Sequence, residues 1–240
     1  MPKAIIIGAT SGIGLACAKE LAQHGYELGL TGRRIELLLE IQKEIKTKTH
    51  IKQSDVTELP KAIHDLQELI QVMDGMDLCL INAGVFHSNP HLDWELEKRT
   101  IDVNVTGFCA MADVAMNYFL KKKVGHLVGI SSISAIRGEA DNPAYSASKA
   151  FVSNYLEALR CKAFKEKAEI IVTDIQPGWV DTPMTKGCEA FWMASADKAA
   201  KQIGAAIYKK RSHAYITARW RLFAWLLKGA PSWLYERYIS

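Results

Sequence analysis

A tyrosine is followed four residues later by a lysine at two places in this sequence, Tyr118 with Lys122 and Tyr145 with Lys149. On a helix such a lysine lies one turn from the phenol, and its charge favours the phenolate, lowering a pKa of ~10 toward the working pH. A tyrosine tuned in this way can pass a proton to or from a carbonyl or alcohol oxygen. Because the spacing occurs twice, it does not by itself identify the pair that does chemistry.

The surroundings of the two pairs differ. Lys122 belongs to a run of three lysines at the end of an amphipathic helical pattern, where cations are favoured, so we interpret the Tyr118 pair as structural. Tyr145 stands at the start of another long helical pattern, thirteen residues after Ser132, which follows a predicted strand. We therefore predict that Tyr145 is the general acid/base and that Lys149 assists it.

A glycine-rich turn follows the first predicted strand, with the sequence Gly8-Ala9-Thr10-Ser11-Gly12-Ile13-Gly14. Small residues allow the backbone to approach a pyrophosphate, and the N-terminus of the next helix supplies free N–H groups and the positive end of a dipole. The spacing differs from the G-x-G-x-x-G fingerprint and lacks the lysine of a P-loop, so ordinary turn chemistry is the alternative. The position after the first strand favours a phosphate-binding turn.

Two arginines, Arg33 and Arg34, follow the second predicted strand. An NAD site of this topology carries an acidic residue near this point to hold the ribose 2′-hydroxyl, whereas arginines suit a 2′-phosphate. Gly32 occupies the place of the acid, which favours NADP(H) over NAD(H). The alternative is that both arginines are solvated at the start of the next helix, a position that disfavours cations unless an anion is bound.

Short apolar runs alternate with longer helical patterns along the whole chain, which is typical of βαβ units. We predict a single-domain, Rossmann-type, doubly wound parallel sheet of about seven strands with helices on both faces. The predicted strands are 3–8, 27–31, 50–53, 77–82, 125–131, 169–176 and 214–217. The predicted helices are 13–24, 34–46, 59–73, 92–122 (as two helices) and 143–167, and Ser195 is expected to cap a further helix. Ligands of such sheets bind at the carboxyl ends of the strands.

The composition excludes several classes of protein. A length of 240 residues leaves no room for two domains of ordinary size, and a net charge of +4 is far from that of a nucleic-acid binder. The five cysteines are widely spaced and odd in number, which indicates the reducing cytoplasm. We find no signal peptide and no apolar run near the ~18 residues of a membrane span. Pro90 separates His87 from His91, so we expect no metal site.

Taken together, these motifs resemble the short-chain dehydrogenase/reductase family over residues 3 to about 217. The resemblance rests on motifs that occur in the family's order and spacing: Gly8-x-x-x-Gly12-x-Gly14, Asn82-Ala83-Gly84, Asn104, Ser132, Tyr145-x-x-x-Lys149 and Pro177-Gly178-x-x-x-Thr182. Each motif alone is weak or moderate evidence, whereas six in register are specific. One departure is Ile7, where many family members carry threonine before the first glycine.

The resemblance implies roles for four catalytic residues. Tyr145 would protonate the substrate oxygen during reduction, and Lys149 would lower its pKa and hold the nicotinamide ribose. Ser132 would hydrogen-bond the substrate oxygen; it is preferred to Ser131 and Ser134 because of its offset from Tyr145. Asn104 would anchor a water that links Lys149 to solvent.

The resemblance also implies a set of cofactor-binding residues around the predicted turn. Asp55 and Val56 match the adenine-contacting position, Asn82 to Gly84 would line the cofactor channel, and Val180 with Thr182 would fix the nicotinamide amide. The complete predicted set is Gly8, Thr10, Ser11, Gly12, Ile13, Gly14, Arg33, Arg34, Asp55, Val56, Asn82, Ala83, Gly84, Tyr145, Lys149, Pro177, Gly178, Val180 and Thr182.

The sequence after Thr182 is expected to select the substrate. In a loop over about 183–195, Met184, Phe191, Trp192 and Met193 would form an apolar lid, or would simply pack against the domain. We divide the chain into a catalytic domain (1–218) and an aromatic, basic, amphipathic tail helix (219–240). The tail is suited to contact with a membrane surface, a partner subunit or its own domain.

We expect an NADPH-dependent oxidoreductase that acts on a small carbonyl compound or secondary alcohol, with an apolar substrate as a hypothesis. The alternatives are a 3-oxoacyl reductase for carrier- or lipid-bound substrates and, from another class, a sensor or scaffold that binds NADP(H) without turnover. The family resemblance further implies a homodimer or homotetramer formed by helices 105–122 and 143–167.

Overall fold

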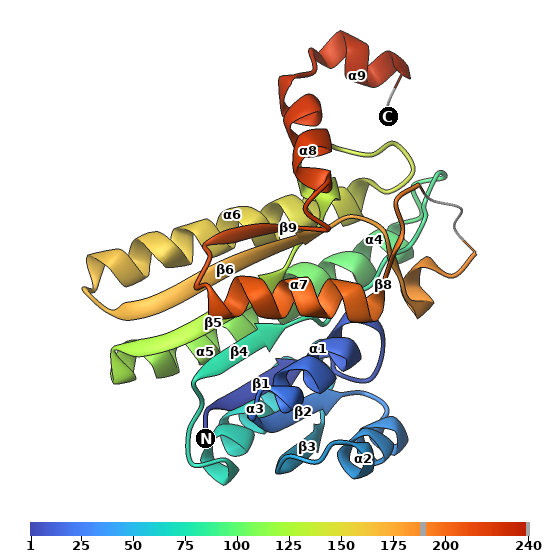
Figure 1. Cartoon of the computed structure of the whole chain (residues 1–240). Coiled ribbons are helices and arrows are strands. Elements are labelled where there is room, and N and C mark those ends of the chain that lie inside the picture. Colours follow the sequence, from blue (N-terminus) through green and yellow to red (C-terminus); the bar gives the residue numbers. More distant parts are fainter. Residues whose placement is uncertain (188–190, 239–240) are drawn as a thin grey trace.

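A seven-stranded parallel sheet forms the centre of the protein, as seen in a computed structural model that describes residues 1–187 and 191–238 (Figure 1). Its strands, in spatial order, are β3 (Thr49–Gln53), β2 (Glu27–Gly32), β1 (Lys3–Ile7), β4 (Leu78–Ile81), β5 (Val124–Ile130), β6 (Glu169–Pro177) and β9 (His213–Ile216). The strand order reverses between β1 and β4, which is the topological switch point of a doubly wound sheet. The predicted fold class and all seven predicted strands are confirmed.

Helices cover both faces of the sheet. The principal helices are α1 (Gly12–Gln23), α2 (Ile35–Glu44), α3 (Leu59–Val72), α4 (Trp94–Ile101), α5 (Phe108–Lys122), α6 (Pro143–Lys165) and α7 (Ala196–Tyr208). Successive β1 residues point to opposite faces: Ile6 packs in one core with α1, α2 and α7, whereas Ile5 and Ile7 pack in the other with α3, α5 and α6. Both layers therefore hold the strand ends in fixed positions.

The predicted boundaries of the seven strands and of four of the helices agree with the structure to within two residues. The prediction of two helices in 92–122 is correct in part. Asp93 caps α4 through its side chain, which accepts from the Glu95 amide, but a π-helical stretch, Asp102–Gly107, then joins α4 to α5 without a break. Such π-bulges are frequent at functional sites.

A second, two-stranded sheet of β7 (Val180–Asp181) and β8 (Ala194–Ser195) was not predicted from the sequence. Strands of two residues are too short to show a period-two pattern, which explains the omission. Ser195 caps α7 as predicted, since its hydroxyl accepts from the Lys198 amide.

The tail consists of two helices, α8 (Trp220–Gly229) and α9 (Ser232–Tyr238), where one was predicted. Pro231 separates them, since proline has no N–H to continue the helix. Trp220, Ala224 and Leu227 on α8 and Tyr235 on α9 are buried against the rest of the chain. None of the helices within residues 1–187 and 191–238 is long and apolar enough to cross a bilayer.

Candidate active site

A groove with a cavity volume of about 260 Å³ runs along the carboxyl ends of the central strands. All of the predicted catalytic and cofactor-binding residues line this groove except Gly14 and Asn104. Gly14 packs directly under the turn and Asn104 lies behind Gly84, so both support the groove from below. The sequence prediction therefore brought together residues that the fold places at one edge of the sheet.

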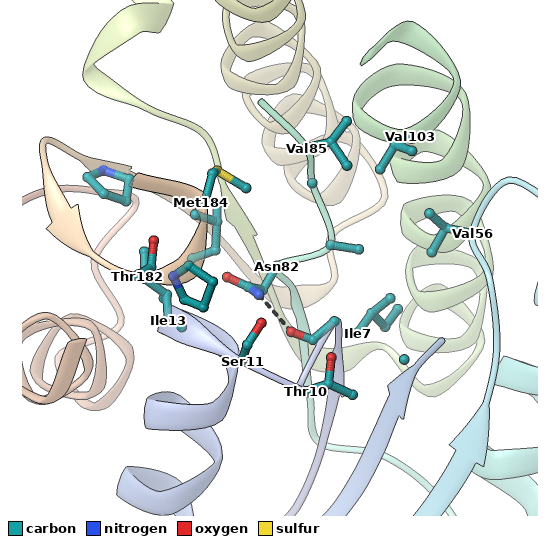
Figure 2. A pocket seen from close by; sticks show the side chains of 18 of the residues that line it. Ile7, Thr10, Ser11, Ile13, Val56, Asn82, Val85, Val103, Thr182 and Met184 are labelled. Carbon is teal, nitrogen blue, oxygen red and sulfur yellow. Dashed lines mark hydrogen bonds between the residues drawn. The ribbon is translucent and has the colours of Figure 1, made fainter. Parts of the chain in front are cut away.

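The turn from β1 into α1 can be built only from glycines at two of its positions. Gly8 has a φ of +87°, and a Cβ there would lie 2.7 Å from the Ala83 nitrogen; a Cβ on Gly14 would lie 2.1 Å from the Gly8 carbonyl oxygen. The Asn82 amide Nδ2 donates to that same carbonyl over 2.7 Å and so ties β4 to the turn (Figure 2). Close backbone packing thus leaves the groove side of the turn open for a bulky ligand.

An anion fits the N-terminus of α1. The capping residue Ser11 makes no side-chain cap hydrogen bond, so the first amides of the helix remain available. Arg34 lies across the turn, with Nη2 donating to Thr10 Oγ1 over 2.7 Å and to Ser11 Oγ over 2.9 Å. The helix dipole and this guanidinium together favour a phosphate group.

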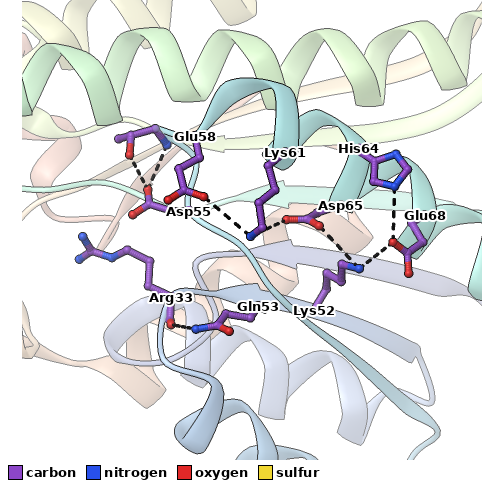
Figure 3. A network of polar contacts seen from close by, with 10 residues as sticks. Arg33, Lys52, Gln53, Asp55, Glu58, Lys61, His64, Asp65 and Glu68 are labelled. Carbon is purple, nitrogen blue, oxygen red and sulfur yellow. Dashed lines mark hydrogen bonds and ion pairs between the residues drawn. The ribbon is translucent and has the colours of Figure 1, made fainter.

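Arg33 and Asp55 stand at the ends of neighbouring strands β2 and β3 (Figure 3). The Ser54 amide donates to the Gly32 carbonyl over 3.0 Å, and the Gln53 side chain donates to the Arg33 carbonyl over 2.9 Å. The Arg33 side chain is exposed at the groove, whereas the Asp55 carboxylate accepts from the amide and hydroxyl of Thr57. The exposed cation at this end of the groove suits a ligand that carries negative charge there.

Ion pairs hold β3 and α3 on either side of the Asp55 turn (Figure 3). Lys52 on β3 contacts Glu68 at 2.6 Å and the buried Asp65 at 3.6 Å, and Lys61 contacts Asp65 at 3.5 Å. Because Asp65 is buried, its two cationic partners compensate a charge that burial alone would destabilise. This network fixes the far end of the groove and lies outside its lining.

Tyr145 and Ser132 meet at the centre of the catalytic edge. Tyr145 lies in the first turn of α6, which Pro143 starts at a position that tolerates proline, and the Phe86 ring packs edge-on against its ring at 4.9 Å. Burial raises the pKa of Tyr145 to about 12, and a contact with the Ser132 hydroxyl opposes that rise. A phenol with this pKa keeps its proton at neutral pH and is available as a donor.

Lys149 lies one helical turn after Tyr145 and is buried. Its Nζ donates to the Ile130 carbonyl over 3.0 Å and stands 5.7 Å from the centroid of the Tyr145 ring. Burial lowers the pKa of Lys149 to about 8, and the Asp174 carboxylate acts in the opposite direction. The pKa of Tyr145 is raised, and not lowered as the sequence predicted, because burial of the phenol dominates.

Asn104 belongs to the π-helical stretch and is fully engaged with the protein. Its Oδ1 accepts from the Val85 amide over 2.8 Å, and its Nδ2 donates to the Val85 carbonyl and to Ser148 Oγ. A Cβ on Gly84 would lie 3.3 Å from Asn104 Oδ1 and 3.4 Å from Lys149 Nζ, so both side chains border this glycine. The arrangement fixes the segment after β4 over the buried ammonium.

A second cavity, of about 230 Å³, adjoins the groove and shares Ser132, Tyr145, Gly178 and Thr185 with it. Most of its other lining residues are apolar or aromatic, and Arg137 and Glu139 are the charged ones among the residues that line it: Phe86, Ile133, Ser134, Arg137, Glu139, Trp179, Phe191, Trp220, Phe223, Leu227 and Tyr235. Trp220 of α8 lies directly on Gly178, where a Cβ would come within 2.0 Å of the indole. A charged groove and a largely apolar cavity thus meet at four residues, two of which are the predicted catalytic residues Ser132 and Tyr145.

Comparison with known proteins identifies the family. The sequence model of the short chain dehydrogenase family matches residues 2–191. The chain is 35% identical over 187 residues to an uncharacterized oxidoreductase of Myxococcus xanthus, covering 76% of this chain and 73% of that protein. It is also 30% identical over 223 residues to an uncharacterized oxidoreductase of Mycobacterium tuberculosis, covering 89% and 87%. The chain belongs to the short-chain dehydrogenase family.

The fold comparison agrees with this assignment. A short-chain dehydrogenase from Sphingobium yanoikuyae, solved in complex with NADPH, superposes with a TM-score of 0.80 over 97% of each chain, at 21% identity. The chain described in Figure 1 therefore has the same fold as that protein over nearly its whole length.

The structure divides the predicted lid residues of this short-chain dehydrogenase between two places. Met184 lines the groove, whereas Phe191 lines the second cavity. Trp192 packs edge-on against Trp220 at 5.6 Å, and Met193 is half-buried next to β8. Three further positions of the predicted loop, Cys188, Glu189 and Ala190, lie outside the described residues, as do Ile239 and Ser240 of the predicted tail.

Asp174 supports the site from behind its lining and was not predicted from the sequence. It is buried on β6 and accepts hydrogen bonds from the hydroxyls of Ser131 and Ser153 and from the Gln176 amide. Its charge raises the pKa of Lys149 against the effect of burial. An acidic residue in the middle of an apolar strand was the available signal, because such a residue needs partners.

The tail of this short-chain dehydrogenase also contributes to the site, in line with the expectation that residues after Thr182 take part in substrate selection. Trp220, Phe223, Leu227 and Tyr235 come from α8 and α9 yet form one wall of the second cavity. The division at residue 218 remains a prediction.

The second tyrosine–lysine pair lies away from this groove. Tyr118 and Lys122 line a different hollow, beside the amino ends of β4 and β5, together with Met76 and His126. The Tyr118 hydroxyl accepts from the Met76 amide over 3.3 Å, which is a structural contact. His87 is also engaged, with Nδ1 next to Thr100 Oγ1 at 3.2 Å, and within the described part of the chain no three metal-binding side chains are grouped.

Proposed function

We propose that this short-chain dehydrogenase transfers a hydride between NADP(H) and an apolar carbonyl compound or secondary alcohol. The observation that carries the proposal is the meeting of two cavities at Ser132 and Tyr145. One cavity has the glycines, helix N-terminus and arginines that suit a dinucleotide, and the other is lined by aromatic side chains. A reaction between two ligands at the shared residues is the simplest use of this arrangement.

NADP(H) fits the groove better than NAD(H) does. Gly32 leaves no carboxylate to receive a 2′-hydroxyl, and a Cβ there would lie 2.6 Å from Thr10 Cγ2, so the position is closed to larger residues. Arg33 is exposed beside it and Arg34 is held over the turn, where both can contact a 2′-phosphate. The NADPH in the Sphingobium structure supports this choice by analogy. The bound nicotinamide would supply or accept the hydride.

Tyr145 is the proton donor in the proposed reduction. Its raised pKa keeps the phenol protonated at neutral pH, so the hydroxyl can donate to a substrate carbonyl oxygen as negative charge develops there. Ser132 stands at the same junction and can donate a second hydrogen bond to that oxygen. In the reverse direction Tyr145 would accept the proton of the alcohol.

Lys149 and Asn104 are proposed to assist proton transfer at Tyr145. The Lys149 ammonium, with a pKa of about 8, is mostly charged at neutral pH and lies beside the Tyr145 ring. Its charge would stabilise the phenolate left after proton transfer. Asn104 fixes the backbone at Val85 over this ammonium, and the proposed water relay from Lys149 to solvent would begin there.

The shape of the second cavity supports an apolar substrate. Aromatic rings of Phe191, Trp220 and Phe223 pack against one another at centroid separations of 5.2 to 5.8 Å and give one wall an aromatic surface. A lipophilic group bound there would bring its carbonyl to Ser132 and Tyr145. A sensor that binds NADP(H) without turnover has no need of such a second cavity beside a complete serine, tyrosine and lysine set.

We also propose that the enzyme forms a homodimer or homotetramer through α5 and α6. Phe151 on α6 is 38% exposed and stacks on Tyr155, whose hydroxyl donates to Asp113 on α5 over 2.7 Å. This partly apolar outer face suits a second copy, and sedimentation of wild type and Phe151→Glu would show a fall in mass for the variant. The cytoplasmic location stays a prediction.

Oxidation of NADPH over a panel of aliphatic and aromatic carbonyl compounds tests the reaction. We expect turnover that rises with the apolar size of the substrate; absence of turnover in both directions with every member would reject the enzymatic function.

The cofactor assignment has a separate test. Titration of NADPH and NADH into wild type and Arg33→Ala should show about tenfold or greater weakening for NADPH and little change for NADH, because a charge-assisted bond to phosphate is lost. Arg99→Ala, at an exposed position on α4, is the matched control. Equal losses for the two cofactors would refute the 2′-phosphate role.

A further inference from the structure

Helix α8 is apolar on two opposite faces. Trp220, Ala224 and Leu227 form its inner face and are at most 8% exposed. On the outer face Leu222, Trp225 and Leu226 are 63%, 66% and 64% exposed, although their side chains are as apolar as those within. A contiguous exposed apolar face on a helix whose opposite face is already buried commonly marks an interaction site, so the outer face is expected to have an occupant.

Polar contacts to residues 137 and 138 hold helices α8 and α9 in place. Arg137 Nη1 donates to the Ala230 carbonyl over 3.0 Å, and its guanidinium lies 4.4 Å from the Tyr235 ring centroid. The Tyr235 hydroxyl donates to the Gly138 carbonyl over 2.6 Å. Trp233, on α9, is 66% exposed as well. Figure 1 shows both helices, in red, standing out from the sheet and its covering helices.

Cations outnumber acidic residues around this surface. Helix α8 and the residue before it carry three cations, Arg219, Arg221 and Lys228, and no acidic residue, whereas Glu236 and Arg237 lie together on α9. Arg219 is engaged with the Trp192 carbonyl, whereas Arg221 and Lys228 are exposed on α8. An isologous contact with a second copy would bring the same cations together, which is unfavourable. The favoured occupant therefore carries negative charge beside apolar material.

We propose that the outer face of α8, together with Trp233, docks on the surface of an anionic lipid membrane. Leucine side chains and indole rings would enter the boundary between headgroups and acyl chains, and Arg221 and Lys228 would lie among the headgroups. Two exposed tryptophans suit this boundary because an indole has an apolar body and one polar N–H. The helix lies in the interface and does not cross it.

The proposal deepens the function proposed above, on which its substrate part rests. The inner face of the same helix forms the wall of the second cavity through Trp220, Phe223 and Leu227. Docking would thus place the substrate cavity one helix away from the lipid. An apolar carbonyl compound dissolved in the membrane is the substrate class that this position serves.

Vesicle co-sedimentation of the full-length chain tests docking without any need for turnover. We expect binding to vesicles of phosphatidylglycerol and phosphatidylcholine, and binding about tenfold or more weaker to pure phosphatidylcholine. The double variant Trp225→Ser/Leu226→Ser and the double variant Arg221→Glu/Lys228→Glu should each reduce binding about tenfold or more. Phe164→Ser is the matched control, because Phe164 is 89% exposed on the distant end of α6.

Three results would overturn the proposal. The first is wild-type chain that stays in the supernatant with anionic vesicles. The second is equal loss of binding in Phe164→Ser and in the α8 variants. The third is a dimer, seen by sedimentation velocity, that the Trp225→Ser/Leu226→Ser change dissociates while vesicle binding is absent, since a second copy would then cover the face. Thermal unfolding of each variant confirms that it is folded.

A kinetic measurement then separates the two proposals. With a lipophilic carbonyl substrate carried in anionic vesicles, the α8 variants should show a KM at least about tenfold higher than wild type at unchanged kcat, and equal kinetics with a water-soluble substrate. Vesicle binding without any turnover would leave docking standing and reject the proposed function. Turnover with equal KM for lipid-borne substrate in wild type and variants would reject the delivery of substrate from lipid.

Discussion

The two tyrosine–lysine pairs of this chain have the same spacing on helices and lie at opposite edges of one sheet. At the carboxyl edge, Lys149 is buried and Tyr145 is half-buried between a charged groove and a largely apolar cavity, and burial shifts the pKa of both. At the amino edge, the Tyr118 hydroxyl accepts a backbone hydrogen bond and Lys122 is exposed. The spacing supplies a pair of side chains, whereas the strand ends around it decide whether the pair can do chemistry.

The largest difference between the pairs is expected for removal of the phenolic hydroxyl. Tyr145→Phe should lower kcat for NADPH-dependent carbonyl reduction about 10³-fold, within the range usual for loss of a general acid. Tyr118→Phe should leave kcat within about twofold, because that hydroxyl lies outside the site. Steady-state kinetics on one good substrate checks both variants. Comparable losses in the two variants would remove the distinction between the edges.

The lysines should differ next, in activity and in the pH dependence of stability. Because burial lowers the pKa of Lys149 from 10.5 to about 8, the unfolded chain binds more protons than the folded chain between these values, and stability rises with pH there. Relative to Lys149→Met, wild type should gain on the order of 3 kcal/mol in unfolding free energy from pH 8 to pH 10.5.

Lys149→Met should also lose activity by about 100-fold or more, since the phenolate loses its charged neighbour. Lys122→Met is the control, with activity and pH profile as in wild type. Denaturant unfolding at several pH values measures the first effect; parallel curves for wild type and Lys149→Met would contradict it.

The amino edge has a titrating group of its own, and its role is structural. His126 lies buried beside Thr173, and burial with the nearby Lys210 lowers its pKa from 6.5 to about 4. Above pH 6.5 His126 is neutral in both the folded and the unfolded chain. As the pH falls from 6.5 toward 4, the unfolded chain takes up a proton at this histidine before the folded chain does, so the folded state loses stability. His126→Gln should therefore lose less stability than wild type over that range, by on the order of 2 kcal/mol. Urea unfolding at pH 7 and pH 4.5 measures it, and equal losses would exclude this role.

The smallest effect is the cost of the Tyr118 hydrogen bond. Tyr118→Phe leaves the Met76 amide without its acceptor, so the unfolding free energy should fall by about 1 kcal/mol at unchanged activity. Chemical denaturation at pH 7 checks this value. A loss of activity without a loss of stability would place Tyr118 in the catalytic machinery after all.

Regular patterns explain how far the sequence predicted this fold. Strand β1 is a continuous apolar run from Ala4 to Ile7 between a proline and a glycine, and β6 has an apolar run near its start and ends at Pro177, so their positions follow from burial on both faces. The residues that line the groove could be predicted in the same way, because Gly8, Ser132 and Pro177 lie at or next to the ends of strands. The Tyr145–Lys149 pair could be distinguished from the Tyr118–Lys122 pair because it follows a residue, Ser132, at the end of a predicted strand.

Other features depend on contacts between distant segments and leave no local pattern. Trp220 packs on Gly178, which is 42 residues earlier in the chain. Strands β7 and β8 pair through only two residues each. The direction of the Tyr145 pKa was mispredicted because the spacing reports the neighbouring lysine, while burial depends on Phe86 and the rest of the fold. Asp174 was not predicted because its hydroxyl partners come from distant parts of the sequence, Ser131 directly after β5 and Ser153 on α6.

The indole of Trp220 rests on the turn after β6, at the boundary between the two cavities. Tryptophan emission overlaps the absorption of a reduced nicotinamide, so energy transfer from this ring would report occupancy of the groove. Trp179 lines the same cavity and would contribute to that signal, whereas Trp94 and Trp225 are exposed and would respond mainly to solvent quenchers. The protein thus carries an intrinsic fluorophore at the junction where its two ligands are proposed to meet.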